Sequence, residues 1–148
     1  MSTRARIAMN DDERRRFLAE QHSLACASIG PNGRPHLVEL WYVPDGDQIV
    51  CWSYAKAQKV RNLERDPRAT LQIETGDRYD ELRGVMLECD VEIERDPERV
   101  AETGIALAEH HPGAPDEQAR AAILRQAPKR VALRFTPTRI TSWDHRKL

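Results

Sequence analysis

Hydrophobic and polar residues alternate along several short stretches of the chain, which is the period of a β-strand with one buried face. The longest such stretch is 82–94, where Val85, Leu87 and later apolar residues alternate with mostly polar ones. Further strands are expected at 23–29, 36–43, 49–53, 69–75, 130–135 and 139–143. The Asn-Gly turn at 32–33 connects the first two, and strands joined by tight turns must be antiparallel.

Other stretches have helical spacing. The expected helices are 10–22, a short one within 54–68, 97–111 and 116–126. Asn10 precedes three acidic residues, which is a helix-start signal, and Val60 and Leu63 are one helical turn apart. The last two helices form a helical insertion at about 97–127.

The order of these elements predicts a mainly β fold. Helices are too few to alternate with strands, which excludes a parallel α/β sheet. Six or seven antiparallel strands at hairpin spacing are typical of a closed or nearly closed β-barrel with peripheral helices. The 148 residues, 40% hydrophobic and 32% charged, are the size of one domain, 1–148.

The charge balance, the apolar runs and the cysteines limit the expected partners and location of the protein. Lys+Arg 23 against Asp+Glu 24 gives a net charge of -1, so no general attraction to nucleic acid or an anionic membrane is expected. No apolar run approaches the ~20 residues of a membrane span, and residues 1–10 lack the apolar core of a secretory signal. We therefore expect a cytoplasmic protein. Three cysteines without CxxC spacing predict free buried thiols.

Common catalytic signatures are absent from the chain. It contains no GxGxxG, GxxxxGK[ST], HExxH or GxSxG motif. His110 and His111 are adjacent and do not share a helix face, so we expect them at a helix C-terminus rather than in a metal site. Neither a catalytic side chain nor a metal is therefore predicted.

The segment 53–62 carries the strongest chemical signal. It is polar and basic, and it lies where a strand is expected to end and a short helix to begin. Free N–H groups at helix starts bind phosphate. Lys56 and Lys59 add positive charge, while Ser53 and Gln58 add neutral hydrogen-bonding groups. The segment indicates a site for a phosphorylated ligand, and an exposed basic turn is the alternative.

The same region, KAQKVRNLERDPRATL, resembles the signature of the flavin/deazaflavin-dependent split β-barrel superfamily, whose founding member is pyridoxamine 5′-phosphate oxidase. The hairpin LACASIGPNGRPHLVEL resembles the opening strands of that family, and RFTPTRITSWDHRKL resembles its actinobacterial tail. The resemblance covers nearly the whole chain and is weakest over 95–128. The chain length and the Lys-x-x-Asn-Leu-x-Arg-Asp-Pro spacing are most similar to the branch that binds coenzyme F420. FMN-dependent oxidases usually have further basic phosphate contacts and a longer C-terminal region.

The resemblance implies a site for a tricyclic cofactor, F420 with FMN as the alternative. Lys59, Lys56 and the backbone of Gln58 would hold its phosphate, and Asn62 would brace the loop or the phosphate. Ser53 and Trp52 would lie along the ribityl chain and ring. The strand residues expected to line the ring are Pro35, His36, Leu37 and Val38.

The resemblance also implies a homodimer with the cofactor site between subunits. Arg78, Trp143 and Arg146 would then complete the pocket of the partner. Glu39 departs from the apolar run around it, and it would either repel an anionic ligand or point to solvent.

Three functions stay open at this point. The first is an oxidoreductase that transfers a hydride between F420 and a conjugated small-molecule substrate, with all hard chemistry supplied by the cofactor. The second is an FMN-dependent, pyridoxamine 5′-phosphate oxidase-like oxidoreductase. The third is a non-catalytic protein that binds F420 or FMN.

Overall fold

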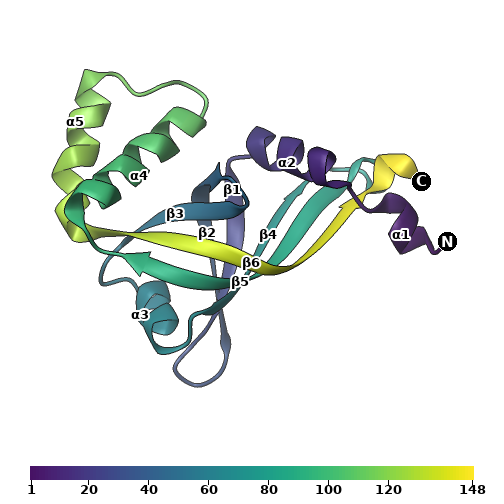
Figure 1. The fold of residues 1–148 in the computed structure, drawn as a ribbon, viewed down its shortest axis with the longest axis horizontal. Coiled ribbons are helices and arrows are strands. Elements are labelled where there is room, and N and C mark those ends of the chain that lie inside the picture. The colour runs from purple at the N-terminus through teal and green to yellow at the C-terminus, as the bar shows by residue number, and fades with distance from the viewer.

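The computed structural model describes residues 1–148 and shows six antiparallel strands closed into one barrel (Figure 1). The strands are β1 (Ser23–Ile29), β2 (Pro35–Asp45), β3 (Gln48–Tyr54), β4 (Arg68–Thr75), β5 (Arg83–Glu94) and β6 (Arg130–Asp144). Around the barrel they follow the order β1-β2-β3-β6-β5-β4. The predicted mainly β antiparallel barrel is confirmed.

The separate strands expected at 130–135 and 139–143 are one strand, and that expectation was wrong. Cys89 of β5 pairs with Pro137 and Glu88 pairs with Arg139, so Thr138 is an extra residue in β6. This is a β-bulge, a place where a strand tolerates proline. The Thr-Pro-Thr segment therefore bends β6 instead of ending it.

The helices lie outside the barrel. They are α1 (Thr3–Ile7), α2 (Asp11–Glu20), α3 (Gln58–Arg65), α4 (Pro97–His110) and α5 (Glu117–Gln126), with short 3₁₀ turns η1 (Tyr79–Glu81), η2 (Ala127–Lys129) and η3 (His145–Lys147). Asn10 caps α2 through a capping box with Glu13, as the sequence predicted. The five-residue α1 was not predicted, because it is too short to show a periodic pattern. No helix has both the length and the apolar character needed to cross a membrane.

The inward faces of the strands form the core. Leu24, Leu71, Val85, Leu133 and Phe135 are among its fully buried side chains. The three cysteines are also free and buried there, as predicted. Burial raises the pKa of Cys26 to about 11 and that of Cys89 to about 12, so these thiols are inert at neutral pH.

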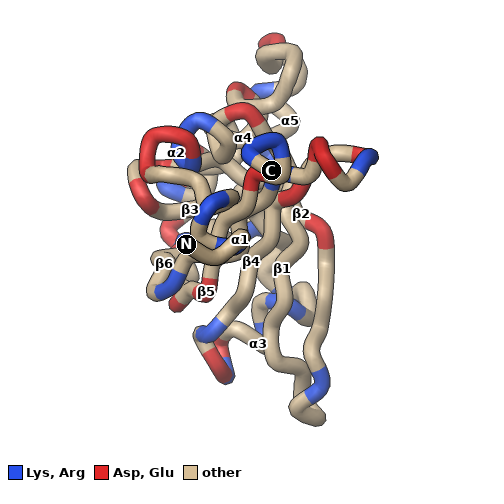
Figure 2. Tube along the Cα trace, turned by 90° about the vertical axis from the view of Figure 1, so that its right-hand side faces the viewer, with Lys and Arg blue, Asp and Glu red and all other residues tan.

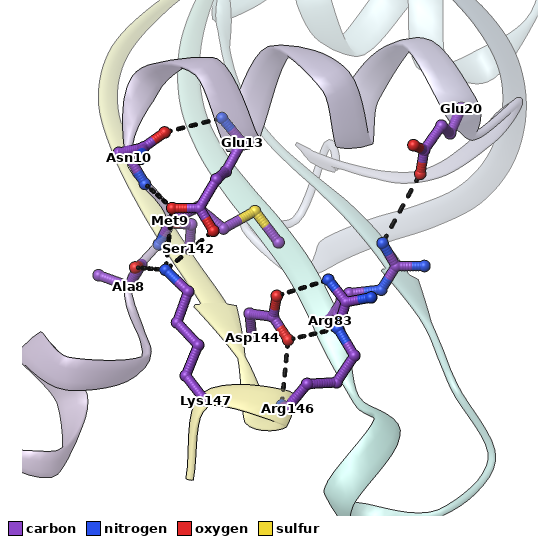
Figure 3. Close-up of polar contacts among 10 residues, drawn as sticks. All are labelled: Ala8, Met9, Asn10, Glu13, Glu20, Arg83, Ser142, Asp144, Arg146 and Lys147. Carbon is purple, nitrogen blue, oxygen red and sulfur yellow. Dashed lines mark hydrogen bonds and ion pairs between the residues drawn. The ribbon is translucent and has the colours of Figure 1, made fainter.

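Both chain ends meet at one end of the barrel (Figures 1 and 3). The Nζ of Lys147 lies 2.9 Å from the carbonyl oxygen of Ala8 and 2.9 Å from the Glu13 carboxylate. The carboxylate of Asp144 is buried and accepts two hydrogen bonds from the Arg146 guanidinium, which lower its pKa. These contacts, the C-terminal clamp, fix the turn η3 at the end of β6 and hold it against Ala8 and the first turn of α2.

Helices α4 and α5 lie at the opposite end, beside the beginning of β6 (Figure 1). Trp52 of β3 donates from Nε1 to the carbonyl oxygen of Val100, 2.9 Å away. Gly104 lies against the Trp52 ring with no room for a Cβ atom. Positive and negative segments are interspersed over the molecule (Figure 2), in agreement with a net charge of -1.

Candidate functional site

The barrel is split along one side. Strand β2 pairs with β1 over seven residues, from Pro35 to Trp41, but it pairs with β3 only from Tyr42 to Asp45. The edge of β2 that faces away from β1 therefore has no strand partner from Pro35 to Trp41. Unpaired strand edges present N–H and C=O groups that can bind a planar ligand.

The start of α3 lies next to this split, directly after β3. Ala57 occupies the N-cap position without a side-chain hydrogen bond, and no acidic residue lies in the first turn. The helix start therefore keeps its partial positive charge free of neutralising side chains. Lys56 and Gln58 flank it and are exposed.

Lys59 is the central cation of this corner. It is half-buried, and its Nζ donates to the Oγ of Ser53, 3.2 Å away. Burial is the main reason that the pKa of Lys59 is lowered, and the charge of nearby Arg130 lowers it further. Lys147 is the only lysine that forms an ion pair, so the Lys59 ammonium has no carboxylate partner. An anionic ligand would supply one.

Asn62 supports the corner from beneath. Its side chain is fully buried, accepts from Gln58 Nε2 at 2.8 Å and donates to Ser28 Oγ at 3.1 Å. Arg65 donates to the carbonyl oxygen of Ile29 at 2.6 Å. These contacts tie α3 to the end of β1, which places Asn62 in a bracing position and away from solvent.

Ser53 and Trp52 lie on opposite faces of β3. Ser53 is buried beside Lys59, whereas Trp52 is half-buried beneath α4. Strand alternation places the two side chains on different surfaces of β3, and their expected positions along a ribityl chain and ring stay a prediction. Trp52 also forms part of a second feature, described below.

The expected ring-lining residues lie along the unpaired edge of β2. Leu37 is 68% exposed and Pro35 is exposed, while His36 and Val38 are half-buried on the other face of the strand. The Nδ1 atom of His36 is buried without a hydrogen-bond partner. Glu39 points outward and is exposed, which agrees with the second of its two expected roles, a side chain that points to solvent.

The three tail and loop candidates lie far from Lys59 within one chain. Arg78 bonds Asp80 at 2.9 Å, and Trp143 donates from Nε1 to Glu74 at 2.9 Å. Arg146 belongs to the C-terminal clamp. They lie toward the barrel end opposite α3, so they do not line the Lys59 corner of their own chain, and their role in a partner's pocket stays a prediction.

Sequence reasoning missed Arg130, which begins β6 and pairs in register with Tyr54. Its guanidinium carbon lies 3.6 Å from the centroid of the Tyr54 ring and 4.7 Å from that of Trp52. Such stacking is a favourable cation–π contact. No local pattern marks Arg130, because its neighbours in space come from a strand 76 positions earlier, at Tyr54.

A histidine cluster was also missed. His22 lies 5.0 Å from His110 and 5.2 Å from His111, measured between ring centroids, and Trp41 stacks on His111 at 3.8 Å. His110 Nε2 contacts the carbonyl oxygen of Gln21 at 2.8 Å. No group of three or more His, Cys, Asp or Glu side chains is arranged to hold a metal ion. The cluster therefore joins α4 to the barrel.

Comparison with known proteins identifies the family of the chain. Residues 11–144 match the family described as pyridoxamine 5′-phosphate oxidase. The chain belongs to this family. A conserved hypothetical protein of Mycobacterium tuberculosis is 37% identical, with a TM-score of 0.90 over 99% of this chain and 92% of its own. No curated protein matches the chain.

More distant solved structures share the fold. An F420 reductase is 21% identical, with a TM-score of 0.66 over 85% of this chain and 94% of its own. A putative 5-nitroimidazole antibiotic resistance protein from Bacteroides thetaiotaomicron is 14% identical, with a TM-score of 0.75 over 92% of this chain and 85% of its own. At such identities the likeness establishes the split-barrel architecture alone.

Proposed function

We propose that the protein is an oxidoreductase that binds coenzyme F420 at the split and transfers a hydride between it and a conjugated small molecule. The observation that carries the proposal is the half-buried Lys59 ammonium without a carboxylate partner, beside an uncapped helix start. Both features favour a phosphate.

The residues present fit such a cofactor. Lys59, with Lys56 and the α3 start, would hold the phosphate, and Ser53 keeps the Lys59 side chain in place. The unpaired edge of β2 between Pro35 and Trp41 would orient a flat ring through backbone groups. Asn62 keeps the corner in position through its bonds to Gln58 and Ser28. When bound, the deazaflavin supplies the hydride chemistry, which needs no nucleophile from the protein.

FMN is the second candidate cofactor, because its phosphate would suit the same corner. The family match favours it, since that family is described by pyridoxamine 5′-phosphate oxidase. The F420 assignment is supported by the similarity in fold to an F420 reductase and by the motif spacing. Their measured affinities for the protein decide between the two cofactors.

The test is a fluorescence titration of the purified chain with oxidised F420 and, in parallel, with FMN. Lys59→Ala should weaken binding of the preferred cofactor by about ten-fold or more, because a charge-assisted hydrogen bond to phosphate is lost. Arg61→Ala on the same helix is the matched control, since Arg61 is exposed. Equal cofactor affinities of the wild type and Lys59→Ala would overturn the proposal. If the wild type binds FMN more tightly than F420, FMN becomes the assigned cofactor.

Catalysis is tested separately from binding. Reduced cofactor mixed with a panel of quinones and enones should be oxidised faster in the presence of the protein than in its absence. A protein that binds the cofactor tightly but accelerates none of these reactions is the binding protein of the third hypothesis.

We also propose a homodimer with the cofactor site at the subunit interface. Leu37 leaves 68% of its surface exposed on the outer face of β2, next to the split. Exposed apolar side chains of this size favour a partner surface. Light scattering after size exclusion should give a dimer, and a monomer that binds the cofactor with full affinity would contradict the shared site.

A further inference from the structure

A groove of about 410 Å³ lies between the helical pair α4/α5 and the outer faces of β2 and β3. Its strand wall comes from Glu39, Leu40, Trp41 and Trp52, and its helix wall includes Leu107 and Ile123. The volume is in the range of small-molecule sites. The β2 part of the wall is the last part of the segment from Pro35 to Trp41 that has no partner on this edge.

The end of the groove carries one cation, Arg130. Its guanidinium stacks on Tyr54 and Trp52, which fixes the plane of the group. Only Nη2 has a hydrogen-bond partner in the protein, the Gln126 side chain at 2.9 Å. Nε is buried without a partner, and no carboxylate pairs with the group. Nη1 also has no partner in the protein and, unlike Nε, is not buried, so this donor of a guanidinium fixed by aromatic rings is open to an anion.

The other lining residues restrict the shape and charge of the occupant. Trp41 and Trp52 are both indoles, and flat apolar side chains favour a flat conjugated ligand. Glu39 is the only carboxylate in the lining, and it comes from the β2 wall. An anionic group is therefore favoured near Arg130 and disfavoured near Glu39.

We propose that this groove is the substrate pocket and that it takes a planar conjugated molecule bearing a carboxylate, which Arg130 receives. The role of the occupant as substrate rests on the proposed function. The binding itself needs only the groove, so it can be measured on the full chain without any cofactor.

The experiment compares two probes of the same size and shape, 2-naphthoate and the uncharged 2-naphthamide, by titration calorimetry. Wild-type protein should bind the naphthoate tighter by about ten-fold, because one charge-assisted hydrogen bond separates the two probes. Arg130→Gln should abolish this preference. Arg134→Gln should preserve it, because Arg134 lies on the same strand but bonds Asp45 and Gln48 outside the groove.

Glu39→Gln should change naphthoate affinity in the direction opposite to Arg130→Gln. Removal of this exposed carboxylate should strengthen naphthoate binding by roughly two-fold and leave the naphthamide unchanged, because only the anion is repelled. Equal affinities of the two probes for the wild type would overturn the proposal. A preference that survives in Arg130→Gln, or that disappears equally in Arg134→Gln, would overturn it as well.

Arg130 also packs on Trp52, so an Arg130→Gln protein that fails to fold would give no binding data. A second measurement therefore uses the wild-type protein alone. In ¹⁵N spectra, naphthoate should shift the indole N–H signal of Trp52 and leave that of Trp143 unmoved, since Trp143 lies at the opposite end of β6 from Arg130. Shifts confined to Trp143 would contradict the site. Equal cofactor affinities of the wild type and Lys59→Ala, with the naphthoate result intact, would overturn the proposed function and leave the groove as an anion-binding pocket.

Discussion

The ammonium of Lys59 lies 3.2 Å from the hydroxyl oxygen of Ser53, at the point where β3 gives way to α3. Ser53 is 2% exposed, and Lys59 is half-buried above it. A lysine that is taken partly out of water toward a neutral hydroxyl gives up hydration without gaining a counter-charge. This relationship explains why the corner is suited to an anionic ligand.

The affinity for a phosphorylated cofactor should depend on pH through Lys59. Burial and Arg130 lower its pKa from the usual 10.5, so the ammonium loses its proton at a lower pH than a free lysine does. Affinity should be constant near neutral pH and should fall as the pH rises toward this lowered pKa. Titrations with FMN or F420 between about pH 7 and 10 would measure the fall, where the phosphate charge is already constant.

Lys59→Arg is the matched control for that prediction. Because a guanidinium stays charged throughout this range, the variant should show a flatter profile. An identical decline in both proteins would show that another group controls the pH dependence.

Tyr42→Phe should destabilise the protein by about 1–3 kcal/mol, the cost of leaving a buried acceptor unsatisfied. The Tyr42 hydroxyl is buried and donates to the carbonyl oxygen of Leu18 at 2.6 Å, in the last turn of α2, where the helix offers that oxygen no partner. Urea unfolding measures the change. Tyr79→Phe is the control, because Tyr79 is 72% exposed, and a similar loss in that variant would contradict the assignment.

The fold could be predicted largely from local pattern, whereas the contents of the site could not. The alternation of apolar and polar residues predicted β5, and the helix-start signal at Asn10 predicted α2, because both patterns depend on residues that are neighbours in sequence. The proximity of Arg130 to Tyr54 depends on the β3–β6 register, which no local pattern encodes. The Lys59 segment could be proposed as a site from the sequence because its residues are contiguous and precede a helix.

Gly104→Ala should destabilise the protein although alanine favours a helix by about 1 kcal/mol over glycine. A Cβ at this position would lie 2.8 Å from the Trp52 ring and 2.7 Å from Ile123, and overpacking of this kind costs about 1–3 kcal/mol. Thermal unfolding should show a lower midpoint, with a changed near-ultraviolet signal from Trp52. Glu102→Ala, on the exposed face of α4, should leave both unchanged.

The three thiols should be unreactive in the native protein. Cys26, Cys51 and Cys89 are all buried, and burial raises the pKa of each thiol, to about 11 for Cys26 and about 12 for Cys89. A colorimetric disulfide reagent at about pH 8 should therefore label none of them rapidly in buffer, because thiolates are the reactive form. In denaturant all three should react. Rapid labelling of one thiol in the folded protein would show that the barrel opens locally.

Stability should fall as the pH decreases through the titration range of histidine. Burial lowers the pKa of His111, and the nearby His22 and His110 lower it further. Its pKa in the unfolded chain is about 6.5, so the folded state binds fewer protons than the unfolded state just below that value. The contribution is therefore fully present above about pH 6.5, is lost as the pH falls, and stops changing below the folded pKa. Urea unfolding from about pH 8 to 5 measures this slope.

His111→Asn should flatten that slope, because the asparagine cannot take up a proton, and His145→Asn provides the control for loss of a histidine outside the cluster. The carboxyl groups with lowered pKa values, such as Asp144 and Glu13, lose their stabilising charge only at more acidic pH, so they do not obscure the effect. Since His111 stacks on Trp41 at 3.8 Å, tryptophan fluorescence should change over the same pH interval. A His111→Asn protein with the wild-type slope would show that acid acts elsewhere than on the contact between α4 and the barrel.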